Sequence, residues 1–385
     1  MNLNFPLLIL FIYSIFNLHC KAQKSELFKI DPTTLIENEI TLADIIDDIS
    51  YIPLDNSIPF IGRLVQVTEG SVFLKIRDGI LVFNREGKLP KRIGNKGRGP
   101  GEYTMGNSFT VDNMTETVYV KDIDFKIKVY SKDGKFLRTI LLPKSEDNFD
   151  FDEIDFLNSH LFVSQFINMG HAKYNWIIMD TLGNFIKSKL NSVPTFKTAN
   201  GFRGGTYVFE NKIHYWNFYN DTIFSILSDF NYRPRFLFAK GKHRWPANPT
   251  KPDQFSQFMF PASLFETNRF FVFSYNYNEK RAIVLFDKRN MKSYMKYLTD
   301  SEDGLINNFD CGIMFHPRQD SYFVENGREY LAGLIEPLKL KSLVKSDNFR
   351  NSTPKFPEKK KELEKLANSL KETDNPVLMM VRLKK

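Results

Sequence analysis

The Gly-rich segment Gly94–Gly106 is the first stretch whose residue types suggest chemistry, because glycine backbone amides can cradle phosphate groups. Phosphate loops lie between a strand and a helix, and they end in Lys-Ser or Lys-Thr. Here Pro100 interrupts the segment and a strand-like pattern follows it. The segment therefore favours a connecting loop, whose glycines permit a sharp path, over a nucleotide site.

Known catalytic signatures are absent from the sequence, so the catalytic residues are unknown. The six histidines form no His-Glu-x-x-His pair, which leaves zinc catalysis without support and predicts no metal site. A Gly-x-Ser-x-Gly nucleophile motif is also missing. Paired carboxylates for glycoside cleavage stay open as an alternative, because a repeating fold brings distant residues such as Asp78, Asp122 and Asp221 together.

An acidic stretch offers oxygen ligands for calcium, and its members are Asp147, Asp150, Asp152, Glu153 and Asp155. The stretch lacks the fixed spacing and the glycine of an EF-hand loop. A solvated acidic loop is therefore favoured over a calcium site. Nothing else in the sequence indicates a cofactor.

Two short segments combine aromatic rings with asparagine amides, namely Asn217–Asn220 and Tyr275–Asn278. Flat rings against apolar sugar faces, with amides bonded to hydroxyl groups, are typical of glycan recognition. The rings proposed for this role are Tyr219, Tyr275 and Tyr277. The alternative is that these rings pack between sheets as part of the core.

Charge and cysteine content exclude several classes of protein. The net charge is +8, but 53 basic residues are spread along the chain among 45 acidic ones, so no nucleic-acid partner is expected. The two cysteines are Cys20 and Cys311, too few for a disulfide scaffold. Aromatic residues make up 15% of the chain, and packed sheets use such side chains on their faces. The composition therefore favours a β protein held by burial and strand pairing.

Residues 1–22 are expected to be a signal peptide. The apolar run Phe5–Leu18 precedes a cleavage pattern with Cys20 at position −3 and Ala22 at −1. Lipidation of Cys20 is the alternative, although the residue before it is not small, as a lipobox requires. Either process exports the protein to the periplasm, the cell surface or the medium, and only lipidation attaches it to a membrane. No later run of about 20 apolar residues predicts a transmembrane helix.

The rest of the chain repeats a pattern of short strands and turns. The segment Ile80–Lys88 returns 47 residues later as Ile127–Lys135, and the same offset relates the apolar residues on either side. Both copies place glycine in a tight turn between alternating apolar residues. Fainter copies follow around residues 177–185, 221–224 and 283–287. Four strands in roughly 40–50 residues are typical of propeller blades.

We therefore predict an all-β fold, a six-bladed β-propeller of four-stranded antiparallel blades, as a single domain over residues 23–385. The predicted blades are Ile61–Ile93, Phe109–Leu142, Phe151–Leu190, Phe202–Ala239 and Pro261–Leu298, with the sixth starting near Asp310. The Lys/Glu/Leu-rich stretch Phe356–Thr373 has its leucines on one face and predicts one helix inserted in the last blade. The strand at residues 50–54 is expected to close that blade beside Val377–Leu383, because an open edge promotes aggregation.

In such a ring, the loops between second and third strands share one face with the connections between blades. Ligands of propellers usually bind on that face, around the mouth of the central channel. The residues predicted to lie there, and to bind the ligand, are Arg77, Asp78, Arg98, Glu102, Asp122, Asp124, Tyr219, Tyr275 and Tyr277.

Five motifs link the chain to a known group of proteins. They are Tyr51–Leu54, the Gly-Arg-Gly-Pro-Gly-Glu-Tyr run within Ile93–Tyr103, Val129–Lys135, Asn220–Ile223 and Asn375–Leu378. With these motifs the sequence resembles the six-bladed β-propeller family of exported proteins and lipoproteins of Bacteroidetes, over nearly the whole mature chain. The resemblance implies the fold. It implies little about activity, because that family is largely uncharacterised and fold does not fix function.

The sequence favours a non-enzymatic binding or interaction scaffold outside the cytoplasm, with a glycan or a partner protein as its ligand. The reason is the lack of a catalytic signature beside an aromatic-rich face. The alternative is a glycan-active enzyme, a lyase or a hydrolase, with its site at the channel mouth. Several convergent titratable groups would favour the enzyme, and exposed aromatic rings would favour the glycan binder.

Overall fold

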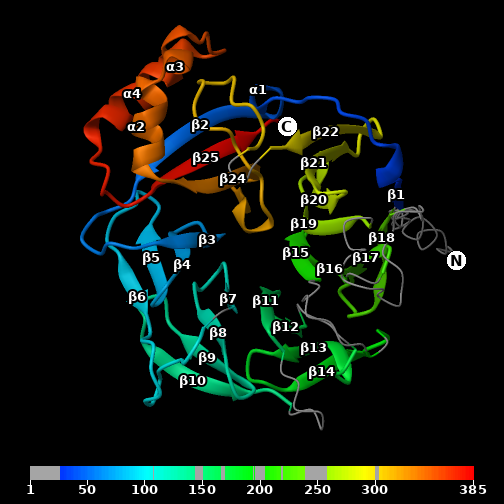
Figure 1. Cartoon of the computed structure of the whole chain (residues 1–385). Coiled ribbons are helices and arrows are strands. Elements are labelled where there is room, and N and C mark those ends of the chain that lie inside the picture. Colours follow the sequence, from blue (N-terminus) through cyan, green and yellow to red (C-terminus); the bar gives the residue numbers. More distant parts are fainter. Residues whose placement is uncertain are drawn as a thin grey trace, which may run out of the picture.

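Six β-sheets form a ring around a common axis, and the strands nearest the centre are β3, β7, β11, β15, β19 and β23 (Figure 1). The structure is a computed structural model, which describes residues 27–106, 108–143, 151–165, 170–193, 195, 204–217, 220–238, 258–299 and 303–385. Each blade contains four antiparallel strands in sequential order, apart from the sixth, which the two ends of the chain build together. The six-bladed β-propeller predicted from the repeat is confirmed.

The first three blades follow the hairpin pattern of the sequence. Blade 1 contains β3 (Gly62–Val67), β4 (Ser71–Ile76), β5 (Gly79–Asn84) and β6 (Lys91–Ile93); blade 2 contains β7 (Ser108–Val111), β8 (Val118–Asp122), β9 (Lys126–Tyr130) and β10 (Phe136–Leu141); blade 3 contains β11 (Glu153–Leu157), β12 (His160–Ser164), β13 (Tyr174–Asp180) and β14 (Phe185–Leu190). Gly87 and Gly134 have φ angles of 73° and 82°, so these two repeated turns need glycine.

The last three blades share this plan with one displaced start. Blade 4 contains β15 (Gly205–Phe209), β16 (Lys212–Trp216), β17 (Thr222–Ile226) and β18 (Tyr232–Phe238); blade 5 contains β19 (Phe260–Glu266), β20 (Phe270–Tyr277), β21 (Lys280–Asp287) and β22 (Lys292–Leu298); blade 6 contains β23 (Tyr322–Glu325), β24 (Arg328–Ile335), β25 (Val377–Leu383) and β2 (Ile46–Pro53). Blade 6 begins later than Asp310, because the preceding segment folds on itself through a bridge between Leu305 and Phe315.

Strands from both ends of the chain meet in blade 6. Strand β2 pairs antiparallel with β25, and Ile52 lies opposite Leu378. Strand β24 pairs with the other side of β25. The Tyr51 hydroxyl donates to the Asp310 carboxylate at 2.7 Å, which ties β2 to the connection that precedes the blade. The strand pair expected between residues 50–54 and 377–383 is present, and it closes the ring.

The chain before β2 runs along the outer edges of blades 4 and 5, and no sequence pattern had indicated this. Strand β1 (Phe28–Ile30) pairs in parallel with β18 and adds a fifth strand to blade 4. Asn38 forms a bridge with Met295 of β22. The short helix α1 (Leu42–Ile45) then leads into β2. We call residues 27–45 the N-terminal belt, and it covers edge groups that would otherwise promote aggregation.

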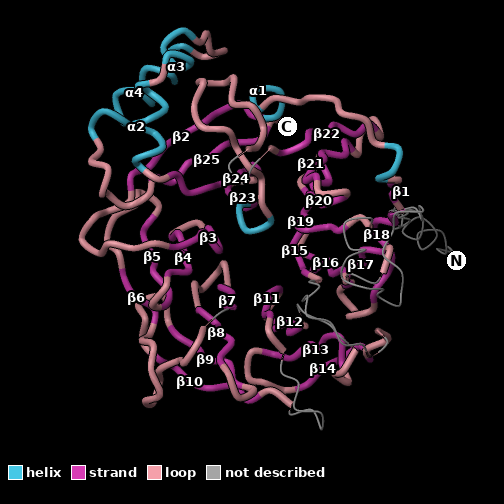
Figure 2. Tube along the Cα trace, in the orientation of Figure 1, coloured by secondary structure: helices cyan, strands magenta, loops and turns pink. Residues whose placement is uncertain are grey.

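Helices are inserted between β24 and β25 on one side of the ring, as Figure 2 shows. They are α2 (Pro337–Lys345), α3 (Asp347–Asn351) and α4 (Pro357–Ser369). The predicted helix corresponds to α4, whereas α2 and α3 were missed. Leu340 and Leu363 are fully buried, and the Lys359 amine lies 3.3 Å from the Asp48 carboxylate of β2, so the insertion packs against blade 6. Among the residues that the structure describes, no helix is long and apolar enough to cross a membrane.

Side chains of one inner strand hydrogen bond the backbone of the next. The Gln66 amide of β3 donates to the Val111 carbonyl of β7 at 2.9 Å, and its oxygen accepts from the Val111 N–H at 3.0 Å. The Ser108 hydroxyl of β7 accepts from the Ile154 N–H of β11 at 3.2 Å. Because buried backbone groups need partners, these bonds fix neighbouring blades relative to each other near the axis.

The seam between blades 4 and 5 contains a buried ionic cluster around Glu266, which ends β19. The Glu266 carboxylate is fully buried and lies 2.9 Å from the Arg235 guanidinium and 2.8 Å from the Lys288 amine. It also accepts from the Tyr207 hydroxyl at 2.9 Å. Burial alone would raise the pKa of Glu266, but the two cations hold that pKa below its usual value. The carboxylate therefore stays ionised inside the protein.

Candidate functional site

The two ends of the ring differ in the connections that they carry. The strand order of a blade places its second turn, and its connection to the next blade, at the same end of the ring. We call this end the crossing face. The other end carries the first and third turns of each blade, and we call it the turn face. The predicted ligand-binding residues that the structure describes belong to loops or strand ends of the crossing face.

Two predicted carboxylates on the crossing face hold the connection between blades 1 and 2. Asp122 is buried and accepts from the N–H groups of Thr104 and Met105 at 2.8 and 3.2 Å. Glu102 accepts from the Gly99 N–H at 2.7 Å. Both side chains therefore have structural partners within the loop.

The glycines of the same connection are explained by packing. Gly94 and Gly106 have φ angles of 60° and 51°, and a Cβ atom on either would lie within 2.8 Å of the ring of Tyr130 or Tyr103. Tyr103 is buried, and its hydroxyl donates to the Ile93 carbonyl at 3.0 Å. The Gly-rich motif thus wraps a buried tyrosine between two blades. This agrees with the sequence interpretation of a connecting loop.

Four further predicted residues, Arg77, Asp78, Arg98 and Asp124, are exposed on the crossing face. Asp124 lies 3.9 Å from the Lys126 amine, which is a weak contact in solvent. Within the part of the chain that the structure describes, no hydrogen bond or ion pair joins these four side chains to one another. The structure therefore brings them to one face without assembling them into a site.

The predicted tyrosines differ in their surroundings. Tyr275 is 3% exposed, and its hydroxyl lies 3.0 Å from the Met295 sulfur. Burial raises the pKa of Tyr275 to about 12, so this ring belongs to the core of blade 5. Tyr277 is half-buried against that core. Tyr219 lies outside the described residues, and contact of Tyr219 or Tyr277 with a ligand stays a prediction.

A different set of polar side chains meets near the axis, where inner strands begin on the crossing face. The Arg63 guanidinium of β3 lies 3.3 Å from the Asp320 carboxylate, which belongs to a short helical turn before β23. Glu153 of β11 accepts from the Ser108 hydroxyl at 2.7 Å, and the positive charge of Arg63 on blade 1 also acts on it. We call Arg63, Glu153, Asp155 and Asp320 the axis cluster.

Burial shapes the electrostatics of the axis cluster. It raises the pKa of Glu153 to about 7, and the neighbouring carboxylates of Asp155 and Asp152 add to the rise. It also raises the pKa of Asp155 to about 6, although the Thr206 hydroxyl donates to that carboxylate at 2.6 Å. Burial raises the pKa of Asp320, although the positive charge of Arg63 acts to lower it. Convergent groups that titrate near neutral pH are typical of functional sites.

Acidification is expected to stabilise the fold through Glu153 and Asp155. Their folded-state pKa values, about 7 and about 6, exceed those of an unfolded chain, so protonation favours the folded state. This contribution is complete below about pH 4 and is lost as the pH rises through about 6 to 7. On going from pH 8 to pH 5, the unfolding free energy of the wild type should rise relative to that of a Glu153→Gln/Asp155→Asn variant. Urea denaturation checks this, and a difference independent of pH would contradict it.

The acidic stretch considered for calcium contributes to the axis cluster instead. Asp147 and Asp150 lie outside the described residues, whereas Asp152, Glu153 and Asp155 lie at the start of blade 3. Across the described ranges, no grouping of three or more His, Cys, Asp or Glu side chains could hold a metal ion. A calcium site that also uses the first two aspartates stays a prediction.

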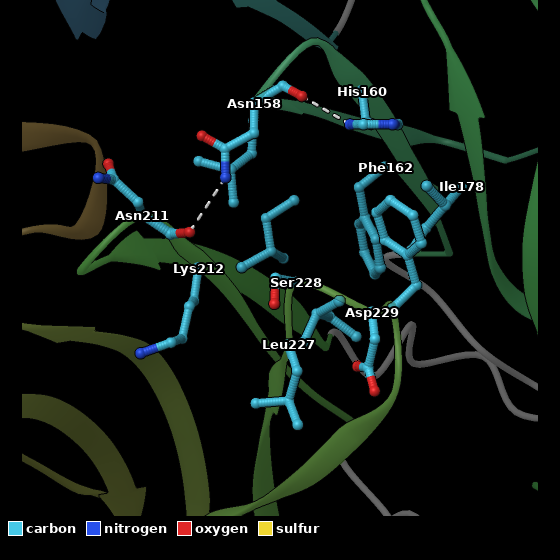
Figure 3. Close-up of a pocket in the computed structure, with 13 residues that line it drawn as sticks. Asn158, His160, Phe162, Ile178, Asn211, Lys212, Leu227, Ser228 and Asp229 are labelled. Atoms are coloured by element: carbon cyan, nitrogen blue, oxygen red, sulfur yellow. Dashed lines mark hydrogen bonds between the residues drawn. The ribbon is translucent and has the colours of Figure 1, made fainter. Parts of the chain in front are cut away.

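A cavity of about 490 Å³ lies on the turn face between blades 3 and 4 (Figure 3). Its apolar lining includes Phe162, Ile178, Ile213 and Ile226. The Asn158 side chain spans the two blades and donates to the Asn211 carbonyl at 3.4 Å, as Figure 3 shows. The lining holds no cluster of facing acids and bases comparable to the axis cluster. It is therefore the weaker candidate site.

Sequence reasoning missed Arg63 and Asp320, and it assigned Glu153 and Asp155 only to a loop that could bind calcium. One available signal was the charge of Arg63 and Glu153 within the first two residues of inner strands, because β7, β15 and β19 begin with Ser108, Gly205 and Phe260. The closeness of Arg63 to Asp320 has no sequence signal, because 257 residues separate them.

The ring of four-stranded blades, with a polar cluster where inner strands begin, defines the protein as a six-bladed β-propeller. The chain belongs to the family described as Domain of unknown function (DUF4934), whose model matches residues 27–382. No curated protein matches the chain. The family and its fold agree with the resemblance identified from the sequence motifs.

Solved structures of Bacteroides proteins share this fold. One, from Bacteroides fragilis NCTC 9343 and described as an exported protein (BF0058), is 20% identical with a TM-score of 0.64, and the match covers 93% of this chain and 99% of that one. Another, a member of the DUF4221 family from Bacteroides vulgatus ATCC 8482, is 12% identical with a TM-score of 0.50, and the match covers 91% of this chain and 99% of that one. At these identities the likeness establishes the fold alone.

Proposed function

We propose that the protein is a non-enzymatic binding scaffold outside the cytoplasm, and that its ligand is a glycan held at the axis cluster. The observation that carries this proposal is the meeting of charged and hydroxyl side chains from the inner strands of several blades at one end of the axis. Arg63 supplies donors, Glu153 supplies acceptors, and Ser108 and Thr206 position the carboxylates beside them. Sugar hydroxyls need donors and acceptors at fixed positions.

Export is part of this proposal. It is supported by the apolar leader with its cleavage pattern at Ala22, and by the exported protein of B. fragilis that shares the fold. Processing then leaves the propeller in the periplasm, in the medium or at the cell surface. Lipidation of Cys20 would add a membrane anchor, and mass spectrometry of the mature N-terminus distinguishes the two forms.

Binding of a glycan should depend on Arg63. The purified protein is screened by thermal shift against a panel of neutral and acidic glycans, and binding of each hit is measured by calorimetry. Arg63→Ala should weaken binding at least tenfold, because it removes the charged donors of the axis cluster. The matched control is Lys132→Ala, which removes an exposed cation from the turn face and should leave affinity unchanged. A protein that binds no glycan, but co-purifies with a protein partner, would contradict the proposal.

The second candidate is a glycan-active enzyme, a lyase or a hydrolase, with its site at the axis cluster. The observation in its favour is the Glu153 carboxyl, whose pKa of about 7 suits proton transfer at neutral pH. An enzyme would cleave the bound glycan, and Glu153→Gln would abolish cleavage while binding remained. A scaffold would bind the same glycan without releasing products.

A further inference from the structure

Cationic side chains gather on the crossing face beside the axis cluster. Arg63 of β3 lies directly opposite Lys75 of β4. Like charges opposite each other destabilise a sheet, so this pair costs stability in the free protein. Lys96, from the connection to blade 2, adds to the repulsion. Burial is the largest cause that lowers the pKa of Lys75, and the positive charges of Lys96 and Arg63 lower it further. Three cations therefore share one part of blade 1.

A second group of cations lies where blade 5 meets blade 6. Arg281 lies at the start of β21, directly after Lys280, and its guanidinium lies 3.3 Å from the Nε2 atom of His316. His316 Nδ1 lies 3.1 Å from the Asp303 carbonyl oxygen, so Nδ1 carries the proton and Nε2 accepts from Arg281. Arg318 is a further cation near this pair. Burial is the largest cause that lowers the pKa of Arg281, and the positive charge of Arg318 lowers it further. We call Arg63, Lys75, Lys96, Arg281 and Arg318 the cationic arc.

Neutral acceptors hold much of the arc in place. The Lys75 amine donates to the Met105 carbonyl at 3.3 Å, and Arg281 donates to the neutral imidazole of His316. The Asp320 carboxylate pairs with Arg63 at 3.3 Å, and the charge of Arg318 also acts on it, so this carboxylate links the two groups of cations. Hydrogen bonds to neutral acceptors orient a cation without cancelling its charge. The arc therefore keeps positive charge that a ligand can neutralise.

We infer that the glycan bound on the crossing face is anionic, with carboxylate or sulfate groups repeated along its chain. This inference rests on the proposed function. The arc extends from blade 5 past blade 6 to blade 1, so an extended chain can place successive anionic groups along it. Arginine matches the geometry of carboxylate and sulfate oxygens with paired hydrogen bonds. The axis cluster beside it then meets the hydroxyl groups of the same chain.

The test uses ligand pairs that differ only in charge. Polygalacturonate is compared with the same polymer after methyl esterification, and chondroitin sulfate is compared with its desulfated form. We expect at least tenfold tighter binding of the more highly charged member of one pair; desulfated chondroitin still carries its uronate carboxylates. Binding should weaken at least tenfold between about 20 and 300 mM NaCl, because salt screens exposed charges. The pair that responds identifies the anionic group.

Variants separate the arc from the overall charge of the protein. Arg63→Gln/Lys75→Gln removes two cations of the arc, whereas Lys88→Gln/Lys132→Gln removes two exposed cations from third turns on the turn face. Only the first variant should lose the preference for the charged polymer. Thermal unfolding of both variants checks that each is folded.

Each of the other possible results contradicts either the anionic ligand, the proposed glycan scaffold or both. Equal binding of the two members in both pairs overturns the anionic ligand but leaves the glycan scaffold standing. Equal losses in the two double variants show attraction to net charge alone and also overturn the inference. Absence of binding to all four polymers overturns the inference, and the neutral glycans of the wider panel then decide the proposed function separately. Preference for an acidic peptide over all four polymers overturns both.

Discussion

Replacing Glu266 with glutamine is expected to lower the free energy of unfolding by about 3–5 kcal/mol, because it removes the anion from a buried ionic cluster. The carboxylate is fully buried between Arg235 and Lys288, at 2.9 and 2.8 Å. The Glu266→Gln variant keeps the size of the side chain but leaves two cations without their buried partner. Urea denaturation followed by circular dichroism measures the loss.

The matched control is Glu364→Gln, which makes the same chemical change at an exposed position of α4. Its effect should stay within about 0.5 kcal/mol, as for most surface substitutions. A loss below about 1 kcal/mol in Glu266→Gln would contradict the expectation. In that case the protein would have relaxed to admit water to the seam between blades 4 and 5.

Removal of strand β2 is expected to abolish cooperative folding. A chain that begins at Asp55 lacks both the N-terminal belt and the strand that pairs with β25 over Ile46–Pro53. The apolar edge of β25 would then be exposed, and exposed edges pair with other chains. We expect this variant to elute as aggregates in size-exclusion chromatography and to show no cooperative thermal transition.

The control for this deletion begins at Leu27 and keeps every strand that the structure describes. It should elute as a discrete species and unfold cooperatively. Cooperative unfolding of the shorter chain, with the same midpoint as the control, would show that blade 6 is stable without β2. That result would contradict a closure that depends on both ends of the chain.

The fold was predictable because each blade repeats a local signal. Gly87 and Gly134 mark the same turn in blades 1 and 2, and alternating apolar residues flank both. The helix α2 gave no such signal: Leu338, Lys339, Leu340 and Lys341 alternate as strand residues do, and only burial of Leu340 against other elements makes them helical. The N-terminal belt was equally hidden, because a three-residue strand carries almost no periodicity.

The candidate site was less predictable than the fold. Sequence reasoning placed Glu102 and Asp122 on the crossing face, but it could not tell that backbone N–H groups would occupy their oxygens. Tyr275 was chosen by residue type, whereas its strand position directs its ring into blade 5. Arg63 and Asp320 meet only after the ring has closed. Residue types therefore indicated which end of the ring these side chains occupy, and contacts between blades decided which side chains meet there.

The closure of blade 6 also sets the order of events in folding. Strand β2 is made early, but its partner β25 comes near the end of the chain, and the insertion α2–α4 is made just before it. Pairing strands so far apart in sequence costs loop-closure entropy and slows folding. Blades 1 to 5 can form from strands that are close in sequence, but the ring closes only when strand β25 is available to pair with β2. The sheet of blade 6 therefore stays incomplete from the time β2 is made until β25 has followed it.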